Sequence, residues 1–281
     1  MDGITLRAPA KINLVLDVDP LGADGYHPIR SLMAELPDIY DTVTVTQSDR
    51  RSVTCAGVAE RDNLAWRALD ALERHIGQPL PLAVVIEKQI PSETGLGGGS
   101  SDAAATLKAA RTLLWLPLSD DELEQIGAHV GSDVPFFIRG GVQWATGRGE
   151  RLQPGTTEPC WAVVVREDVG LSTARVYEHF DRLPPLPRVE LASREFNPLR
   201  EARNDLWQAA RSLVPGLGGV AEVLRSAGAS RVLLCGSGSS VAGLVADASS
   251  AEATAARVAA LRPGMWCRWS RVASTVGPTT S

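Results

Sequence analysis

Apolar and polar positions alternate along several segments of this chain, and a period of two predicts β-strands. Residues 4–18 alternate in this way and predict two extended pieces, one on each side of a central proline. The segment 42–46 alternates threonine with valine, which is typical of a strand. Further strands are expected at 82–90, 161–165, 231–234, 241–245 and about 265–272.

Other segments repeat apolar residues every three or four positions, the period of an amphipathic helix. Asn63 precedes one such segment, which runs to about His75. Ser119 and Glu122 have the spacing of a capping box and predict a second helix start. More helices are expected from about 103 and at 204–213, 217–227 and 250–261. Because strands and helices follow no steady βαβ order, we expect an α+β fold with two lobes.

Prolines gather at 184–199, and this stretch is a candidate linker between domains. A boundary nearer residue 155 is the alternative. We expect an N-terminal domain over residues 1–155 and a C-terminal domain over residues 156–281.

A glycine-rich run, Pro91 to Asp102, joins the strand predicted at 82–90 to an alanine-rich helix. Glycine lets the backbone approach an anion, and the first N–H groups of a helix attract phosphate. We expect Ser100 and Ser101 to cap the helix. The run matches neither common nucleotide loop, because no lysine follows the glycines and Ser100 stands where a third glycine is needed. A linker without a ligand is the alternative, and the helix start argues against it.

Composition excludes several classes of function. The chain has 281 residues, 44% of them hydrophobic, as in ordinary folded proteins. No apolar run approaches the ~18–20 residues that span a bilayer, and we see no signal peptide. Four widely spaced cysteines form no CxxC pair, so we expect a reducing cytoplasm and neither a metal site nor disulfides. The net charge of −5 argues against a nucleic-acid binder.

Lysine is rare here: of 28 basic residues only Lys11, Lys88 and Lys108 are lysines. Lys11 sits among apolar neighbours and needs a partner if it is buried, although its ammonium group can also reach water. Asp133 precedes an apolar run and is either a cap or a functional carboxylate. A lysine–aspartate pair beside a phosphate would take a hydroxyl proton and stabilise the transferred group. Lys88 and Lys108 are expected to be surface charges.

Two segments offer aromatic side chains. Asp24-Gly25-Tyr26-His27 reads as a turn that presents a flat ring and an imidazole, or as a simple polar turn. Tyr177 lies on a predicted amphipathic helix, where packing in the core is the alternative to a binding role.

Together these segments resemble the GHMP kinase superfamily. The resemblance rests on the Pro9–Asn13 start, the Pro91–Ala105 loop and helix, and a late loop at Gly236–Ser240, and it spans about residues 8–246. It is strengthened by shorter motifs: Asp24–His27, Asp62–Leu64, Gly131–Pro135, Ser172–Thr173 with Val176–Tyr177, and Asn204–Leu206. These are most similar to the branch that acts on a cytidine-diphosphate-linked polyol in non-mevalonate isoprenoid precursor synthesis.

The resemblance implies a two-lobed kinase whose active site lies in the cleft between the lobes, with ATP and Mg²⁺ as cofactors. Asp133 would be the general base and Lys11 its charged partner. The polyol and its nucleotide would be held by Asn13, Tyr26, His27, Tyr177, Gly236, Ser237 and Gly238. The ATP site would comprise Asn63, Leu64, Pro91, Gly95, Leu96, Gly97, Gly98, Gly99, Ser100 and Ser101. The expected state is a monomer or weak homodimer without nucleic-acid or membrane partners.

The chain departs from the family pattern at a few positions. Glu93 places a carboxylate in the phosphate loop, and we expect it to point to solvent. Cys235, Ser239 and the segment 34–40 are also atypical. The alternatives are a related kinase acting on a mevalonate-like or homoserine-like substrate, an inactive ligand-sensing homologue, and an unrelated α+β binding domain.

Overall fold

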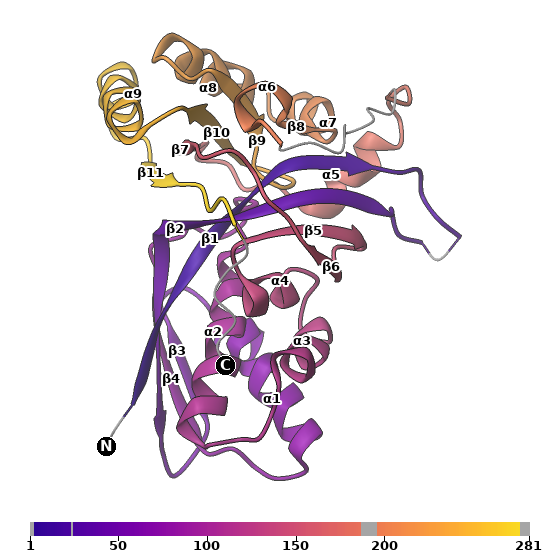
Figure 1. Cartoon of the computed structure of the whole chain (residues 1–281), viewed down its shortest axis with the longest axis vertical. Helices are drawn as coiled ribbons and strands as arrows, with labels where there is room; N and C mark the ends of the chain where they lie inside the picture. The colour runs from indigo at the N-terminus through magenta and orange to yellow at the C-terminus, as the bar shows by residue number, and fades with distance from the viewer. Residues whose placement is uncertain (1–2, 24, 187–195, 276–281) are drawn as a thin grey trace.

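The computed structural model describes residues 3–23, 25–186 and 196–275. Its elements form four layers in the order helices, sheet, sheet, helices (Figure 1). This confirms the expected mixture of helices and sheets in two lobes. No helix in the described ranges is long and apolar enough to cross a membrane.

The first sheet is built around two long antiparallel strands, β1 (Ile4–Val18) and β2 (Ile29–Gln47). β4 (Leu82–Glu87) pairs with the C-terminal half of β2, and β5 (Val142–Gly147) pairs with its N-terminal half. β3 (Ser52–Cys55), β6 (Arg151–Pro154) and β8 (Arg203–Asn204) complete the seven strands. The sequence predicted two pieces for β1 and only 42–46 for β2, and both strands are longer and continuous.

The outer face of this sheet is covered by four helices: α1 (Leu64–Ile76), α2 (Gly98–Leu113), α3 (Asp120–Ala128) and α4 (Val134–Arg139). A short 3₁₀ turn, Glu60–Asp62, precedes α1. Asn63 caps α1 by accepting a hydrogen bond from the Ala65 N–H, and Ser119 and Glu122 form the predicted capping box of α3. Both helix starts are therefore confirmed, because local side chains satisfy the free N–H groups of the first turn.

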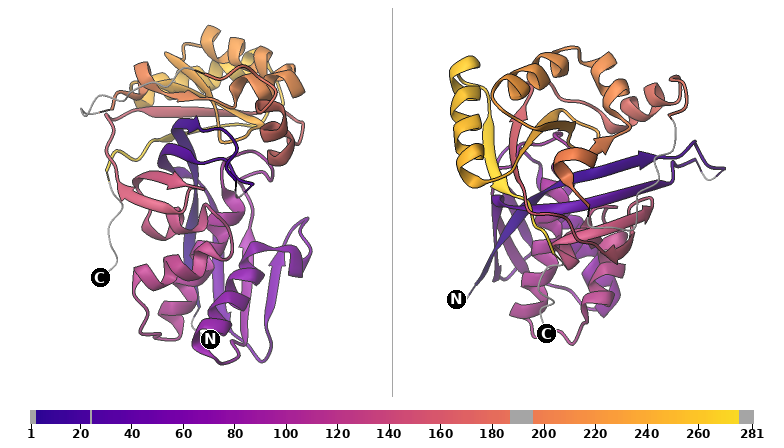
Figure 2. Two further views of the ribbon diagram at one scale, coloured as in Figure 1. Left: turned by 90° about the vertical axis from the view of Figure 1, so that its right-hand side faces the viewer. Right: turned by 45° about the horizontal axis from the view of Figure 1, so that its top comes forward.

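The second sheet has the order β11-β7-β10-β9. Its strands are β7 (Trp161–Arg166), β9 (Arg231–Leu234), β10 (Ser240–Val245) and β11 (Cys267–Arg271). Its outer face carries α5 (Thr173–Phe180), α7 (Trp207–Leu213), α8 (Gly216–Ser226) and α9 (Ala248–Leu261), while α6 (Pro198–Glu201) lies beside β9 and β10 (Figure 2). The strands and helices predicted in this half agree with these bounds within a few residues.

The two sheets share a hydrophobic core. Ile12 and Leu36 of the first sheet are buried in the same cluster as Val164 and Leu233 of the second. β8 also returns the chain to pair with β1 after the second sheet has begun. The expected linker at 184–199 lies largely outside the described residues. The expected boundary at 155 falls between β6 and β7, and it stays a prediction.

Candidate active site

The glycine-rich run ends in the first turn of α2. Gly97 is the N-terminal cap residue, with a φ of 74° that only glycine adopts readily, and it makes no side-chain capping bond. Ser101 is the first residue whose N–H reaches back to the Gly97 carbonyl, at 2.9 Å. The N–H groups of Gly98, Gly99 and Ser100 therefore have no partner within the helix.

The expectation that serines cap this helix is wrong. Ser100 and Ser101 lie inside its first turn, and Gly97 takes the cap position because its left-handed backbone turns the chain into the helix. The Ser101 hydroxyl is buried and has no hydrogen-bond partner among the described residues.

Lys11 and Asp133 meet although 122 positions separate them in the chain. The Lys11 Nζ atom lies 3.4 Å from Asp133 Oδ2, with side chains 5% and 32% exposed. Lys11 also donates to Asn13 Oδ1 at 2.7 Å, and Asn13 donates to the Ser31 hydroxyl at 2.8 Å. The buried ammonium thus has two oxygen partners, which offset the cost of removing it from water.

This pair lies beside the start of α2. The Lys11 N–H donates to the Leu96 carbonyl at 2.9 Å. A Cβ atom on Gly97 would lie 3.1 Å from Lys11 Cγ and 2.9 Å from the Phe137 ring, so only glycine fits there. The Ser100 hydroxyl lies 3.7 Å from where a Cβ would stand on Gly131. The carboxylate, the ammonium and the unpaired N–H groups of α2 are therefore close together.

Asn63 and Leu64 lie next to the same loop. The side-chain oxygen of Asn63 accepts the capping hydrogen bond of α1, and Leu64 Cδ1 lies 3.5 Å from where a Cβ would stand on Gly99. They are placed to contact a nucleotide held by the loop, and that role stays a prediction.

Two of the predicted aromatic residues lie together, and one of them is near Asp133. The rings of His27 and Tyr177 are 5.1 Å apart. Burial and the charge of Asp133 raise the pKa of Tyr177 to about 12, so its hydroxyl stays protonated. The two His27 ring nitrogens already contact protein, with Nδ1 2.9 Å from the Asp19 carbonyl and Nε2 3.3 Å from Asp181.

Tyr26 is half exposed, and Arg148 lies over its ring at 3.5 Å. The predicted sandwich between Tyr26 and Tyr177, and the predicted reading of a base edge by His27, stay predictions. Asp24, the first residue of this motif, lies outside the described residues.

The late loop Gly236–Ser240 packs directly against the phosphate loop. A Cβ on Gly95 would stand 1.8 Å from the Cys235 carbonyl oxygen, and the Ser240 N–H donates to the Thr94 carbonyl at 3.2 Å. Asn204 donates to the carbonyls of Leu234 and Gly236 at 2.9 and 2.7 Å. The sequence motif at 204–206 gave no sign of this supporting role.

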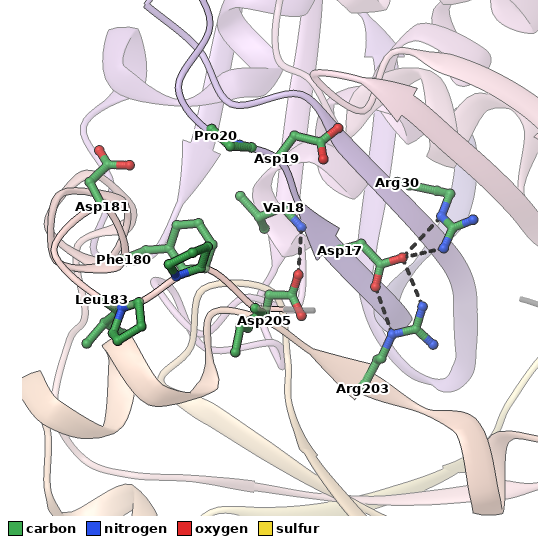
Figure 3. A pocket seen from close by; sticks show the side chains of 13 residues that line it. Asp17, Val18, Asp19, Pro20, Arg30, Phe180, Asp181, Leu183, Arg203 and Asp205 are labelled. Carbon is green, nitrogen blue, oxygen red and sulfur yellow. Dashed lines mark hydrogen bonds and ion pairs between the residues drawn. The ribbon is translucent and has the colours of Figure 1, made fainter. Parts of the chain in front are cut away.

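A cavity of about 690 Å³ borders the aromatic group (Figure 3). Asp17 lines this cavity and pairs with both Arg30 and Arg203. Asp181 also lines the cavity, and its carboxylate faces His27. Lys11 and Asp133 do not line this cavity.

Two lysines differ from expectation. Lys88 is only 18% exposed and pairs with Asp41 and Asp102, and burial lowers the pKa of Lys108. The prediction that both are surface charges is wrong, because the fold buries most of each side chain, and Lys88 finds its partners on segments that are distant in the sequence.

No group of three or more His, Cys, Asp or Glu side chains in the described part of the chain could hold a metal ion. Mg²⁺ in phosphate-transfer enzymes keeps several waters and is bound largely through substrate phosphates. An Mg²⁺ ion would be carried by the ATP phosphates, and this stays a prediction.

Comparison with known proteins agrees with this geometry. The family model described as GHMP kinases N terminal domain matches residues 63–141, and GHMP kinases C terminal matches residues 188–263. A protein of Citrifermentans bemidjiense named 4-diphosphocytidyl-2-C-methyl-D-erythritol kinase is 38% identical over 272 residues, covering 93% of this chain and 96% of its own. A Streptomyces avermitilis protein of the same name is 40% identical and covers 98% of both chains.

Solved structures give the same grouping. A crystal structure of 4-(cytidine 5'-diphospho)-2C-methyl-D-erythritol kinase superimposes with a TM-score of 0.79 at 31% identity, covering 98% of this chain and 100% of the other. A homoserine kinase from Cytophaga hutchinsonii, covering 98% of this chain and 96% of its own, gives a TM-score of 0.72 at 16% identity and shows the fold alone.

Proposed function

The chain belongs to the GHMP kinase family and, within it, to the 4-diphosphocytidyl-2-C-methyl-D-erythritol kinases, and from that premise we propose that it transfers the γ-phosphate of ATP to the 2-hydroxyl of 4-diphosphocytidyl-2-C-methyl-D-erythritol. The reaction belongs to non-mevalonate isoprenoid precursor synthesis. The observation that carries the proposal is the 3.4 Å contact between Lys11 and Asp133 beside Gly97.

Asp133 accepts the proton of the substrate hydroxyl, and the resulting oxygen attacks the γ-phosphorus as the bond to ADP breaks. Lys11 holds the carboxylate in place and stabilises negative charge on the transferred group. Asn13 fixes the ammonium by accepting one of its hydrogen bonds. The free N–H groups at Gly98–Ser100 bind the ATP phosphates, and Mg²⁺ would be bound with ATP and would neutralise part of the phosphate charge.

The nucleobase of the substrate lies near Tyr26, His27 and Tyr177, and the late loop Gly236–Gly238 lies over the substrate phosphates. Tyr177 supports this placement, because the nearby charge of Asp133 contributes to its raised pKa and its ring lies against the ring of His27. We place the enzyme in the cytoplasm, since its four cysteines are free thiols, and we propose a monomer or weak homodimer.

The test is Asp133→Asn. We expect kcat to fall by about 10³-fold, while the Kd for MgATP changes less than about threefold, because the base acts only on the hydroxyl. Asp121→Asn, at an exposed position on α3, is the matched control. A variant at Asp133 that keeps near-normal turnover removes this residue from the mechanism.

The substrate is tested separately by offering the cytidine-linked methylerythritol beside mevalonate and homoserine. We expect phosphorylation of the first alone. Preferred use of either other alcohol would overturn the substrate assignment and leave the phosphate-transfer chemistry intact.

A further inference from the structure

Three charged side chains lie together under the first turns of α2. Lys88 Nζ donates to Asp102 Oδ2 at 2.8 Å and also to Asp41 Oδ2. The carboxylates of Asp41 and Asp102 are 0% and 3% exposed. Asp41 is on β2, Lys88 follows β4, and Asp102 is on α2. The cluster therefore connects both strands to the helix that follows the glycine-rich loop.

The two carboxylates have different surroundings. Asp41 Oδ1 accepts hydrogen bonds from the N–H groups of Gln89 and Ile90. Asp102 Oδ1 is buried and has no hydrogen-bond partner among the described residues. With a proton on Asp102, Lys88 and Asp41 form a neutral pair. Without it, the cluster carries a net charge of −1.

This charge lies close to the proposed phosphate site. The Lys88 ammonium is 3.2 Å from where a Cβ would stand on Gly98, the first residue of α2. The cluster is largely shielded from water, so its field reaches the loop with little screening.

We propose that Asp102 is a positioning residue that couples nucleotide binding to a proton: the protonated cluster favours the ATP phosphates at the start of α2, and the ionised cluster opposes them. The proposal rests on the proposed function, because it assumes that the loop binds nucleotide phosphates. Asp102 acts through the charge beneath Gly98 and does not itself touch the substrate.

The titration of Asp102 falls in an accessible range. Burial raises the pKa of Asp102 to about 7, against the lowering effect of Lys88 and with a further raising effect from Asp41. Cys55 on β3 also faces the cluster, and burial raises the pKa of its thiol, so the thiol stays neutral in this range. The pKa of Asp102 therefore lies inside the range from pH 6 to pH 8 that the experiment covers.

The experiment measures the Kd of MgATP at pH 6.0, 7.0 and 8.0 with saturating Mg²⁺. For the unmodified enzyme we expect the Kd of MgATP to increase about fivefold from pH 6.0 to pH 8.0, beyond the change caused by the titration of ATP itself. Asp102→Asn keeps the side chain's shape and its contact with Lys88, and it should lose this extra change. The titration of ATP is common to both proteins and cancels in their ratio.

Asp247→Asn is the control. Asp247 caps α9 at an exposed position in the second lobe, and its hydrogen bonds lower its pKa, so it stays ionised throughout. It should show the pH dependence of the unmodified enzyme. Thermal unfolding of each variant checks that it is folded.

A second measurement needs no variant. Calorimetric titration of the unmodified enzyme with MgATP at pH 7.5, in two buffers of different ionisation enthalpy, should detect proton uptake beyond that of the nucleotide. Equal pH ratios in Asp102→Asn and the unmodified enzyme, or no proton uptake, would overturn the inference. An enzyme that binds MgATP with this coupling but phosphorylates none of the three alcohols would instead refute the proposed function.

Discussion

At position 11 the chain uses a lysine, although 25 of its 28 basic residues are arginines. The structure gives a reason for this choice. The stem of Lys11 and the ring of Phe137 both lie against Gly97, and the compact ammonium of Lys11 reaches both Asn13 and Asp133. A planar guanidinium is larger and spreads its donors over a fork, so it cannot occupy this position in the same way.

We therefore predict that Lys11→Arg, which keeps the charge, lowers kcat by about 100-fold, because the transferred group loses a positioned donor. The Kd for MgATP should change little, since the N–H groups of α2 remain. Steady-state kinetics with an equilibrium binding measurement test this. Turnover within threefold of the unmodified enzyme would mean that charge alone suffices at this position.

The residues of the two charged clusters differ in how far the sequence alone predicts their roles. Lys11 stands out as a lone lysine among apolar neighbours, and Asp133 as a lone carboxylate before an apolar run. Lys88, Asp41 and Asp102 look like ordinary charges, because their pairing depends on segments 14 and 47 positions apart that only the fold brings together.

At the scale of elements, the two glycine loops are packed backbone to backbone. Gly95 and Gly236 both have positive φ, and a Cβ on either would approach the backbone of the other loop. The glycines of the first loop thus serve contact between the lobes, in addition to the phosphate binding that we propose for them.

Gly95→Ala should consequently destabilise the protein by about 3 kcal/mol or more, because the new methyl meets a backbone carbonyl that cannot move aside. Gly57→Ala is the matched control: its φ of 75° equals that of Gly95, but a Cβ there meets nothing within 4 Å. It should cost only about 1 kcal/mol of backbone strain. Denaturant unfolding compares them, and equal losses would show that contact between the loops is unimportant.

The elements that sequence patterns missed have identifiable causes. For β2 the alternation of threonine and valine predicts only residues 42–46, and the part before it contains Pro37, a residue that interrupts regular strand pairing. In the structure residues 37–39 bulge from the pairing with β1, whose Pro9 and Ala10 face Tyr40 and Leu36. The bulge places Asp38 against the N–H of Arg271 on β11. The two residues of β8 are too few for any period to show.

At the scale of the whole molecule, the lobes are joined by one core, by the β1–β8 pairing and by the loop contact. The expected units 1–155 and 156–281 would each lose part of that core if separated. Hydrophobic residues of both sheets fill it, and so do the buried thiols of Cys160 and Cys235. Burial raises the pKa of each thiol to about 12, so neither forms a thiolate near neutral pH while the core is closed.

These two thiols therefore report on whether the lobes open separately. If the shared core makes folding cooperative, alkylation of Cys160 and Cys235 should follow the global unfolding curve in denaturant, with one midpoint for both. Cys55 and Cys267 are partly exposed and should react earlier, which provides an internal control. Mass spectrometry of peptides after short pulses of alkylating reagent measures all four in one experiment. Reaction of either buried thiol well below the midpoint would show that the lobes part while each stays folded, and the cleft between them would then open without unfolding.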